Sequence, residues 1–483
     1  MSQSYLTLSQ LRQDLLNHKT SCTDRVRFHL DIISRKKHLN AFLSVFDQEA
    51  LAAAAVVDQK IAEGKAGKLA GLVVGIKDVF SFKDHPLQGS SKILKGFVAQ
   101  YNATVIQRLL DEDAIIIGRQ NCDEFAMGSS NENSAFGPVL NELDNERVSG
   151  GSSGGSAVAV MADMCQVSIG SDTGGSVRQP AAFCGVVGLK PTYGRISRYG
   201  LSAYGSSFDC VGILSKSIED AAAVLQVIAG SDEFDSTVSS LPVPNYARSL
   251  ETVDNNKYKI AFLKETLNSD SLQPEIKQVL EEKITSLRSQ GHHVEIVDFP
   301  LMDYLLPTYY ILATAEASSN LSRYDGVRYG YRSDHAPDIL SVYKRSRTEG
   351  FGEEVKRRIL LGTFVLSANY YDAYYNKAQK VRRLIRDQTR ALFKNYDFVM
   401  MPTTPTIAFK INQHQDDPVA MYLADLFSVH ANVAGIPAIS IPAGKNNQGL
   451  PIGIQVMAAD FEESKLFQFS NSLVNFDKSS ATR

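Results

Sequence analysis

Residues 147–180 read RVSGGSSGGSAVAVMADMCQVSIGSDTGGSVRQP and contain two separate clusters of glycine and serine. The first cluster, residues 150–156, has the composition of a flexible linker when it is taken alone. It is followed, however, by the helix-forming apolar run 157–162, by a strand-like stretch at 166–170 and by the second cluster at 172–176. Because linkers separate folded parts and these glycines lie within one apolar unit, we expect the stretch to form the floor of an active site.

The second cluster places a serine hydroxyl next to two glycines. Glycine permits a positive φ and leaves backbone N–H groups open to a ligand. The hydroxyl of Ser176 is therefore a candidate nucleophile. The N–H groups of Thr173, Gly174 and Gly175 are candidate donors to the oxyanion that forms when a carbonyl is attacked. Such a nucleophile still requires a base.

A lysine at the end of a predicted strand is the candidate base. Leu72–Ile76 is apolar throughout, as in strands that are buried on both faces, and Lys77 follows it directly. Burial would lower the pKa of this lysine and so increase its neutral fraction, which is the form that accepts a proton. On local sequence alone, Lys77 and Asp78 are typical of a solvated ion pair at a strand end, and the paired Gly-Ser clusters favour the first interpretation.

The two clusters resemble the signature of the amidase signature family, in which GGSSGGS is followed by DTGGSxRxP; the motifs stand here at residues 150–156 and 172–180. A lysine on an upstream strand completes the site in that family. The resemblance implies Lys77 as the base, Ser152 as a bridging serine in a cis peptide, and Ser176 as the nucleophile. It also implies the family's fold, an α/β structure with a large central mixed β-sheet covered by helices on both faces.

Length and composition indicate one large globular domain. The chain has 483 residues, of which 44% are hydrophobic and 21% charged, and no Pro-rich or charged linker divides it. We expect a helical N-terminal part at 1–65, the signature core at 66–230, and the rest of the sheet with substrate-recognition elements at 231–483. Predicted elements include the helices Thr7–Asn17, Asp24–Arg35, Gln48–Glu63, Ser217–Ala229 and Pro274–Gln290, the strands Lys259–Leu263 and 292–297, and a surface excursion at 231–256.

Charge and cysteine content limit the partners and the compartment. The net charge is −3 and the pI is near 6.3, so the chain has no overall basic field for nucleic acid or for an anionic membrane. The five cysteines form no CxxC pair, which favours a reducing compartment. The sequence shows no signal peptide and no apolar run of about 18 residues. We expect a cytoplasmic protein that does not bind a membrane.

Other chemistries lack their motifs. His292 and His293 are neighbours in a predicted strand, so their side chains point to opposite faces, and no HExxH pattern occurs. No GxSxG elbow surrounds Ser176, and neither Gly-rich cluster ends in the GK[ST] of a phosphate loop. We therefore expect this chain to hold no metal and no cofactor such as ATP. The cationic segment 380–386 is more typical of a solvated helix face than of an RNA contact.

Three later segments, residues 309–330, 346–363 and 370–375, resemble the A subunits of tRNA-dependent amidotransferases, a branch of the same family. The resemblance implies a glutaminase that works with partner subunits B and C. It implies that a partner subunit uses ATP and Mg²⁺ and holds most of the mischarged tRNA(Gln), or in some cases aspartyl-tRNA(Asn). Two alternatives stay open: a stand-alone amidase acting on a small neutral or aryl amide, and a non-catalytic scaffold.

The same resemblance assigns the charged ends of glutamine. Arg358 matches the position that binds the carboxylate, with Arg357 as an alternative, and Asp425 matches the position that binds the ammonium group. A partly dry pocket requires charges of this kind, because an unpaired ion is costly to bury.

Three further residues are expected at the pocket wall. Met127 and Ser129 lie in the loop that leads to the first cluster, and Tyr309 offers a hydroxyl. Two departures from the family pattern, at residues 207–214 and at His430, leave the local shape of the pocket open.

Overall fold

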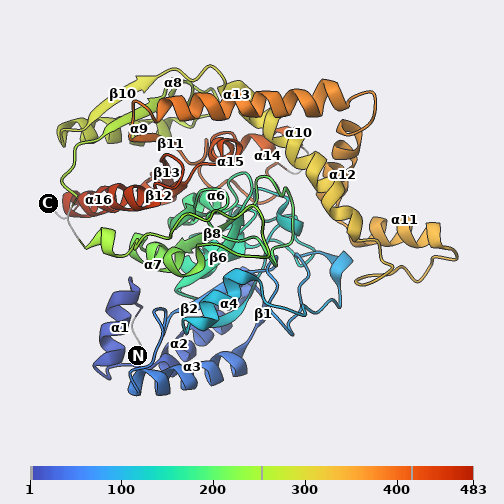
Figure 1. Ribbon diagram of the computed structural model, residues 1–483, viewed down its shortest axis with the longest axis horizontal. Helices are drawn as coiled ribbons and strands as arrows, with labels where there is room; N and C mark the ends of the chain where they lie inside the picture. Colours follow the sequence, from blue (N-terminus) through green and yellow to red (C-terminus); the bar gives the residue numbers. More distant parts are fainter. Residues whose placement is uncertain (1–3, 252–253, 415–416, 482–483) are drawn as a thin grey trace.

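The structure is built on a mixed β-sheet of eleven strands, with a separate two-stranded sheet (Figure 1). This computed structural model describes residues 4–251, 254–414 and 417–481. The strands are β1 (Phe42–Val45), β2 (Val73–Lys77), β3 (Ile115–Gln120), β4 (Leu140–Asn141), β5 (Asp144–Val148), β6 (Val167–Asp172), β7 (Val187–Lys190), β8 (Cys210–Ser215), β9 (Lys259–Leu263), β10 (His293–Val297), β11 (Phe398–Pro402), β12 (Ala438–Lys445) and β13 (Pro451–Met457).

The large sheet has the strand order β1-β3-β2-β6-β8-β7-β12-β13-β11-β9-β10. Strand β2 runs parallel to both of its neighbours, β3 and β6, whereas β6 pairs antiparallel with β8. Every residue of β2, β3, β6, β7 and β8 is buried, so both faces of the central sheet are covered. The predicted large mixed sheet with helices on both faces is confirmed.

Helices pack on the sheet in several groups, among them α3 on β3, with α2 packed against α3, and α9 on β10 and β11, and a further group lies at the end of the sheet. Helices α5 and α6 pack against each other and on the central strands, and α4, α7 and α16 form another group, in which α7 contacts β7 and β8. Helices α10, α12 and α13 pack together beyond the sheet (Figure 1). In the described part of the chain, no helix has the length and apolar composition to cross a membrane. The helices are α1 (Leu8–Leu16), α2 (Cys22–Arg35), α3 (Asp47–Ala62), α4 (Thr104–Asp111), α5 (Gly154–Met161), α6 (Arg178–Cys184), α7 (Ile218–Ile228), α8 (Lys264–Leu267), α9 (Pro274–Ser289), α10 (Met302–Asn320), α11 (Ile339–Gly350), α12 (Glu353–Val365), η6 (a π-helix, Tyr371–Asn376), α13 (Lys377–Leu392), α14 (Pro418–Leu423), α15 (Val429–Ala434) and α16 (Glu463–Ala481).

Most local predictions agree with these elements to within one or two residues, whereas helix α5 begins at Gly154, three residues before the predicted run 157–162. Helix α2 begins two residues before its predicted start, because the hydroxyl of Ser21 caps it by accepting from the N–H of Asp24. The strand predicted over 292–297 begins one residue later, because β10 starts at His293; His292 lies outside the strand, and its Nδ1 accepts from the N–H of Tyr258 at 3.1 Å. The two adjacent histidines therefore have separate environments.

The predicted surface excursion at 231–256 lies partly outside the described residues. Its described part is irregular apart from a short 3₁₀ turn, Arg248–Leu250. It is nevertheless anchored, because Tyr246 is buried and its hydroxyl accepts from Nε of Arg195 at 2.7 Å. A polar excursion can thus still place one aromatic side chain in the core.

Candidate active site

Lys77 ends strand β2 inside the protein, surrounded by serine hydroxyls. Its Nζ lies 2.7 Å from Oγ of Ser152, 2.9 Å from Oγ of Ser153 and 3.0 Å from Oγ of Ser171. The lysine side chain is fully buried. The structure therefore brings the predicted base to the predicted bridging serine and excludes the solvated ion pair as a description of Lys77.

Ser152 lies in the first Gly-Ser cluster, which is buried throughout and packed against neighbouring chain. The peptide between Gly151 and Ser152 is cis, as the family resemblance implied. A Cβ at Gly151 would lie 2.0 Å from Oδ2 of Asp123, which accepts from the N–H of Asn131 at 2.9 Å. This close approach requires glycine and is incompatible with a flexible linker.

Ser176 lies at the turn that follows β6, and 8% of the residue is exposed. Its carbonyl accepts from the N–H of Ser153 at 3.1 Å, which holds the two Gly-Ser clusters together. Within the described residues, no hydrogen bond joins the hydroxyls of Ser152 and Ser176. Catalytic hydrogen bonds are often long until substrate is bound, so this geometry is compatible with a relay through Ser152.

Burial is the main influence on the charge of Lys77. It lowers the pKa of Lys77 to about 8, against the opposing effect of nearby acidic groups that include Asp123 and Asp172. Burial also raises the pKa of the neighbouring Cys122 thiol to about 12, so this thiol is uncharged where Lys77 titrates. About one lysine in ten is then neutral at pH 7, compared with fewer than about one in a thousand for an ordinary lysine.

The turn at 173–175 is held between two side chains. A Cβ at Gly174 would lie 2.4 Å from Cζ of Tyr309, and a Cβ at Gly175, where φ is +130°, would lie 2.0 Å from Oγ of Ser428. The hydroxyl of Ser428 also donates to the carbonyl of Gly174 at 2.6 Å. Both glycines are therefore needed for the turn to fit, and Tyr309 touches it directly.

The N–H groups of this turn are not equivalent. The N–H of Gly175 donates to Oδ1 of Asp172 at 2.9 Å, so it is already used. The N–H groups of Thr173 and Gly174 have no such partner in the described chain. Burial would raise the pKa of Asp172, but Arg178 outweighs it and brings that pKa to about 2, so the carboxylate keeps its charge. Thr173 and Gly174 are thus the better candidates for oxyanion donors.

Arg358 reaches the interior from helix α12, whereas Arg357 does not. The Arg358 side chain is 3% exposed, and its Nη1 donates to the hydroxyl of Tyr204 at 2.8 Å. Its guanidinium also lies 5.3 Å from the ring centroid of Tyr310. The Arg357 side chain is 49% exposed and pairs with Glu354. Of the two arginines that the sequence left as alternatives, Arg358 therefore points into the protein, and Arg357 points toward solvent.

Asp425 contacts the same tyrosine as Arg358, Tyr310. Its Oδ2 accepts from the hydroxyls of Ser129 at 2.7 Å and Tyr310 at 2.9 Å. Burial raises the pKa of Asp425 to about 6, while those two hydrogen bonds and the charge of Arg358 oppose the rise. Tyr310 therefore touches both the buried cation and the buried anion.

Sequence reasoning missed Tyr310 and Tyr204, which lie beside Arg358. Tyr310 is adjacent to the predicted Tyr309, and this pair of tyrosines is the signal that could have identified it. Met127 is fully buried, and its described hydrogen bonds stay within its own loop, to Glu124 and Asn133. Ser129, the other predicted wall residue in this loop, reaches the charged cluster through its hydrogen bond to Asp425.

The two departures from the family pattern have different neighbours. Asp209 accepts from Oγ1 of Thr173 at 2.6 Å, so segment 207–214 does contact the turn that carries the candidate oxyanion donors. His430 is buried, its Nε2 lies 2.8 Å from Oγ1 of Thr389, and its ring centroid lies 4.7 Å from that of Phe299. Burial lowers the pKa of His430 to about 3, so it is neutral at ordinary pH.

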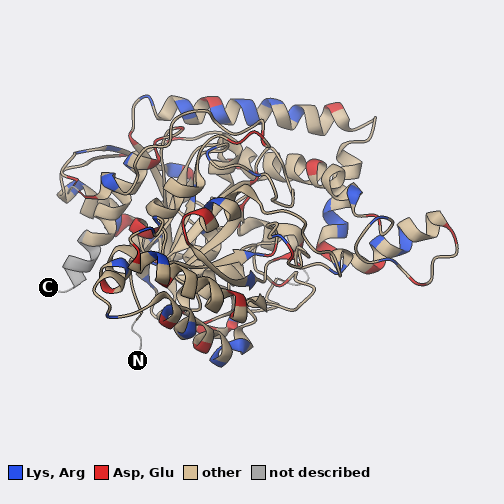
Figure 2. Ribbon diagram, turned by 60° about the horizontal axis from the view of Figure 1, so that its bottom comes forward, with Lys and Arg blue, Asp and Glu red and all other residues tan. Residues whose placement is uncertain are grey.

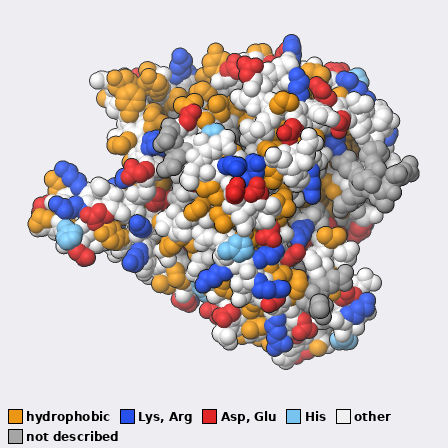
Figure 3. All heavy atoms as spheres, turned by 180° about the vertical axis from the view of Figure 1, so that it is seen from behind, with side chains coloured by type: hydrophobic (Ala, Val, Ile, Leu, Met, Phe, Trp, Pro, Cys, Tyr) orange, Lys and Arg blue, Asp and Glu red, His pale blue; other side chains and the backbone are white. Residues whose placement is uncertain are grey.

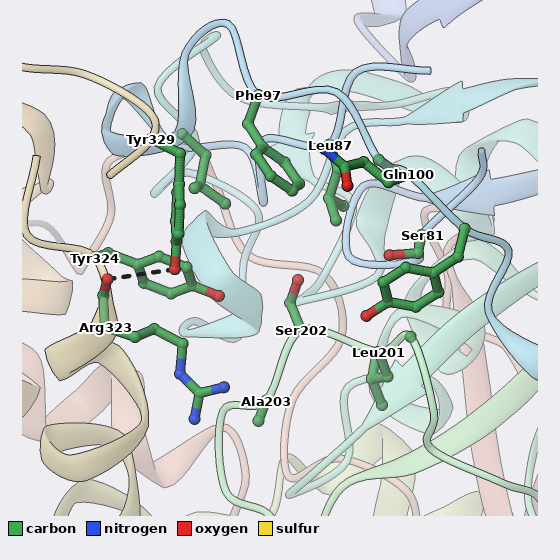
Figure 4. A pocket seen from close by; sticks show the side chains of 14 residues that line it. Ser81, Leu87, Phe97, Gln100, Leu201, Ser202, Ala203, Arg323, Tyr324 and Tyr329 are labelled. Carbon is green, nitrogen blue, oxygen red and sulfur yellow. Dashed lines mark hydrogen bonds between the residues drawn. The ribbon is translucent and has the colours of Figure 1, made fainter. Parts of the chain in front are cut away.

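A separate cavity of about 410 Å³ adjoins the chain that follows Lys77 (Figure 4). Figure 4 shows Phe97, Tyr324 and Tyr329 around it, with Ser202 between them. The N–H of Ser202 donates to the carbonyl of Val79 at 2.8 Å. None of the predicted site residues lines this cavity, so it is distinct from the Lys77 site.

Comparisons with known proteins agree over almost the whole chain. A family model described as Amidase matches residues 25–467. The A subunit of the glutamyl-tRNA(Gln) amidotransferase of Prosthecochloris aestuarii is 52% identical over 469 residues, which cover 97% of this chain and 98% of that protein. The corresponding protein of Chlorobium luteolum is 51% identical over 98% of both chains.

Solved structures show the same similarity. The crystal structure of the A subunit of glutamyl-tRNA(Gln) amidotransferase from Thermotoga maritima has a TM-score of 0.76 at 38% identity and covers 94% of this chain and 91% of that one. A peptide amidase in complex with the inhibitor chymostatin has a TM-score of 0.82 at 28% identity, with coverage of 97% and 96%. Both comparisons therefore extend over nearly the complete fold.

Proposed function

This chain belongs to the amidase family, and we propose that it is the glutamine-hydrolysing subunit of a tRNA-dependent amidotransferase. Its similarity to the A subunits of that enzyme extends over almost the full length of both chains. The observation that supports glutamine as the substrate is the buried cation Arg358 and the buried anion Asp425, both of which contact Tyr310. An amide without charged ends would gain nothing from these two ions.

The proposed reaction uses the serines around Lys77. The hydroxyl oxygen of Ser176 attacks the side-chain amide carbon of glutamine, and its proton passes through Ser152 to neutral Lys77. The N–H groups of Thr173 and Gly174 hold the oxyanion. The C–N bond then breaks, and the leaving nitrogen takes the proton from Lys77 and departs as ammonia. Water hydrolyses the acyl-enzyme on Ser176, which releases glutamate and restores the hydroxyl.

The ends of glutamine are bound by groups that already have hydrogen-bond partners. Arg358 binds the α-carboxylate through a guanidinium oriented by Glu354 and Tyr204. Asp425, oriented by Ser129 and Tyr310, binds the α-ammonium group. These partners fix both ions before the substrate arrives, which reduces the ordering that binding requires.

Ammonia passes to a partner in this proposal. Partner subunits B and C form a heterotrimer with this chain, and the partner that binds the mischarged tRNA also uses ATP and Mg²⁺. Three exposed aromatic side chains at the end of α12 and the start of η6 form one cluster: the ring centroid of Phe364 lies 4.2 Å from that of Tyr370 and 5.8 Å from that of Tyr374. An exposed apolar cluster of this kind is typical of a surface that contacts another protein, which supports assembly. Exposed apolar side chains gather at this end of the molecule in Figure 3. We place the complex in the cytoplasm, since all five cysteines are free and buried.

The test compares the purified chain with and without partner subunits, ATP, Mg²⁺ and glutamyl-tRNA(Gln), and measures release of glutamate and formation of glutaminyl-tRNA. We expect the partners to raise glutamate release, and a coupling of about 1–3 kcal/mol corresponds to roughly 5- to 150-fold. Ser176→Ala should lower the rate of glutamate release about 10³-fold or more, both with and without the partner subunits. Rapid hydrolysis of neutral amides that ignores the partners would instead identify a stand-alone amidase.

A further inference from the structure

A second cavity, of about 530 Å³, lies along helix α13 and is lined by four arginines, Arg382, Arg383, Arg386 and Arg390. Arg382, Arg386 and Arg390 are four residues apart, so they project from one side of the helix. The opposite wall comes from residues 192–193, 433–435 and 460–461. Figure 2 shows the cationic segments that recur along α13 at the top of the molecule.

The charge inside this arginine cavity is unbalanced. Asp460 is its single lining carboxylate, and it pairs with Arg390 at 2.8 Å. Arg383 pairs with Asp387 at 2.9 Å on the exposed surface of the helix. Arg386 has no hydrogen bond or ion pair among the described residues. Among the residues that the structure describes, no carboxylate is therefore in direct contact with the guanidinium groups of Arg382 and Arg386.

Arg382 distinguishes this cavity from an ordinary solvated helix face. Its guanidinium donates to the carbonyl of Ser207 at 2.7 Å and to its Oγ at 2.8 Å, and it lies 4.0 Å from the ring centroid of Phe208. The nearby carboxylate of Glu316 accepts from the N–H of Ser207 at 2.9 Å. The floor of the cavity is thus an oriented, partly buried cation, which is attracted by the Glu316 carboxylate and repelled to a smaller extent by Arg386.

We propose that the arginine cavity binds a phosphate-bearing ligand. Planar guanidinium groups donate paired hydrogen bonds that match phosphate oxygens, and several arginines on one wall can share a single phosphate. The volume of about 530 Å³ is within the range of small-molecule sites and exceeds the needs of one phosphate ion. The same chemistry is found in free phosphate, in a nucleotide and in the backbone of RNA.

Three probes separate these sources. Calorimetric titration of the full-length chain with inorganic phosphate and with ATP, and anisotropy of a short fluorescent single-stranded RNA, measure each Kd at one fixed ionic strength. The test variant is Arg386→Gln, which alters an exposed side chain and leaves Arg382 and its bonds to Ser207 intact. The matched control is Arg345→Gln on α11, which removes the same charge from an exposed helical position outside the cavity.

We expect saturable binding of at least one probe, weakened about tenfold or more by Arg386→Gln and unchanged by Arg345→Gln. The probe that shows this pattern identifies the source of the phosphate. Equal weakening by the two variants would mean that only overall charge matters, and it would overturn the proposal. So would wild-type affinity of Arg386→Gln for every probe, or the absence of saturable binding of all three by the wild-type chain.

Discussion

Raising the pH from 7 to 9 should raise kcat/KM about tenfold for a primary amide that lacks an α-amino group, with a plateau above a single ionisation near pH 8. The reason is the buried Lys77, whose pKa is lowered to about 8 by desolvation. Only the neutral amine accepts a proton, so activity is lost as the pH falls, and the neutral fraction rises from about one-tenth to about nine-tenths over this range. A lysine with an ordinary pKa would give a rise of nearly a hundredfold without a plateau.

Two substitutions test whether this ionisation belongs to Lys77. Asp123→Asn removes a nearby carboxylate that favours the ammonium form, so the ionisation should move to lower pH. Cys122→Ala should leave it in place, because the thiol, with a pKa of about 12, carries no charge near pH 8. Melting curves of both variants show whether each is folded, since the Asp123 carboxylate also holds the N–H groups of Asn131 and Asn133.

The assay follows initial rates of glutamate release by the chain with its partners from pH 6.5 to 9 at constant ionic strength. A primary amide without an α-amino group is measured in parallel, because its own charge does not change over this range. A kcat/KM that is flat for both substrates would refute Lys77 as the base. An equal shift of the ionisation in Cys122→Ala and in Asp123→Asn would refute the electrostatic account of its pKa.

Other predictions concern the substrate pocket. Asp425→Asn should raise KM for glutamine roughly tenfold or more, with little change for an amide that lacks the α-amino group, and equal loss on both substrates would contradict its role. In the wild type, KM for glutamine should rise as the pH falls through about 6, where the raised pKa of Asp425 lets the carboxylate become protonated. Arg358→Gln should raise KM by a similar factor, whereas the half-exposed Arg357→Gln should not, and steady-state kinetics of the pair measures the difference. Gly174→Ala should lower kcat by about 10² or more without unfolding the chain, because its Cβ would push the turn away from the Tyr309 ring; near-normal kcat would exclude this turn as the oxyanion site.

The sequence by itself determined the local elements and the residues that carry the chemistry. The predicted strand Lys259–Leu263 has the same bounds in the structure. The helix predicted over Pro274–Gln290 begins at Pro274 and ends at Ser289, one residue before its predicted end. Such elements depend on side-chain periodicity and on caps within a few residues, which the sequence displays directly. The Gly-Ser motifs likewise identified Lys77 and Ser152, which the structure places 2.7 Å apart.

Tertiary packing decided which side of each helix serves the site. Arg357 and Arg358 are neighbours in one helix, as are Tyr309 and Tyr310, and local sequence cannot choose between them. Successive helical residues point about 100° apart, so the contacts of α10 and α12 with the rest of the chain turn Arg358 inward and leave Arg357 half-exposed. Tyr310 contacts Asp425 only because α10 and the segment before α15, distant in sequence, pack together. The charged pocket is therefore a product of packing between helices, since the directions of its side chains are set by contacts that no single segment contains.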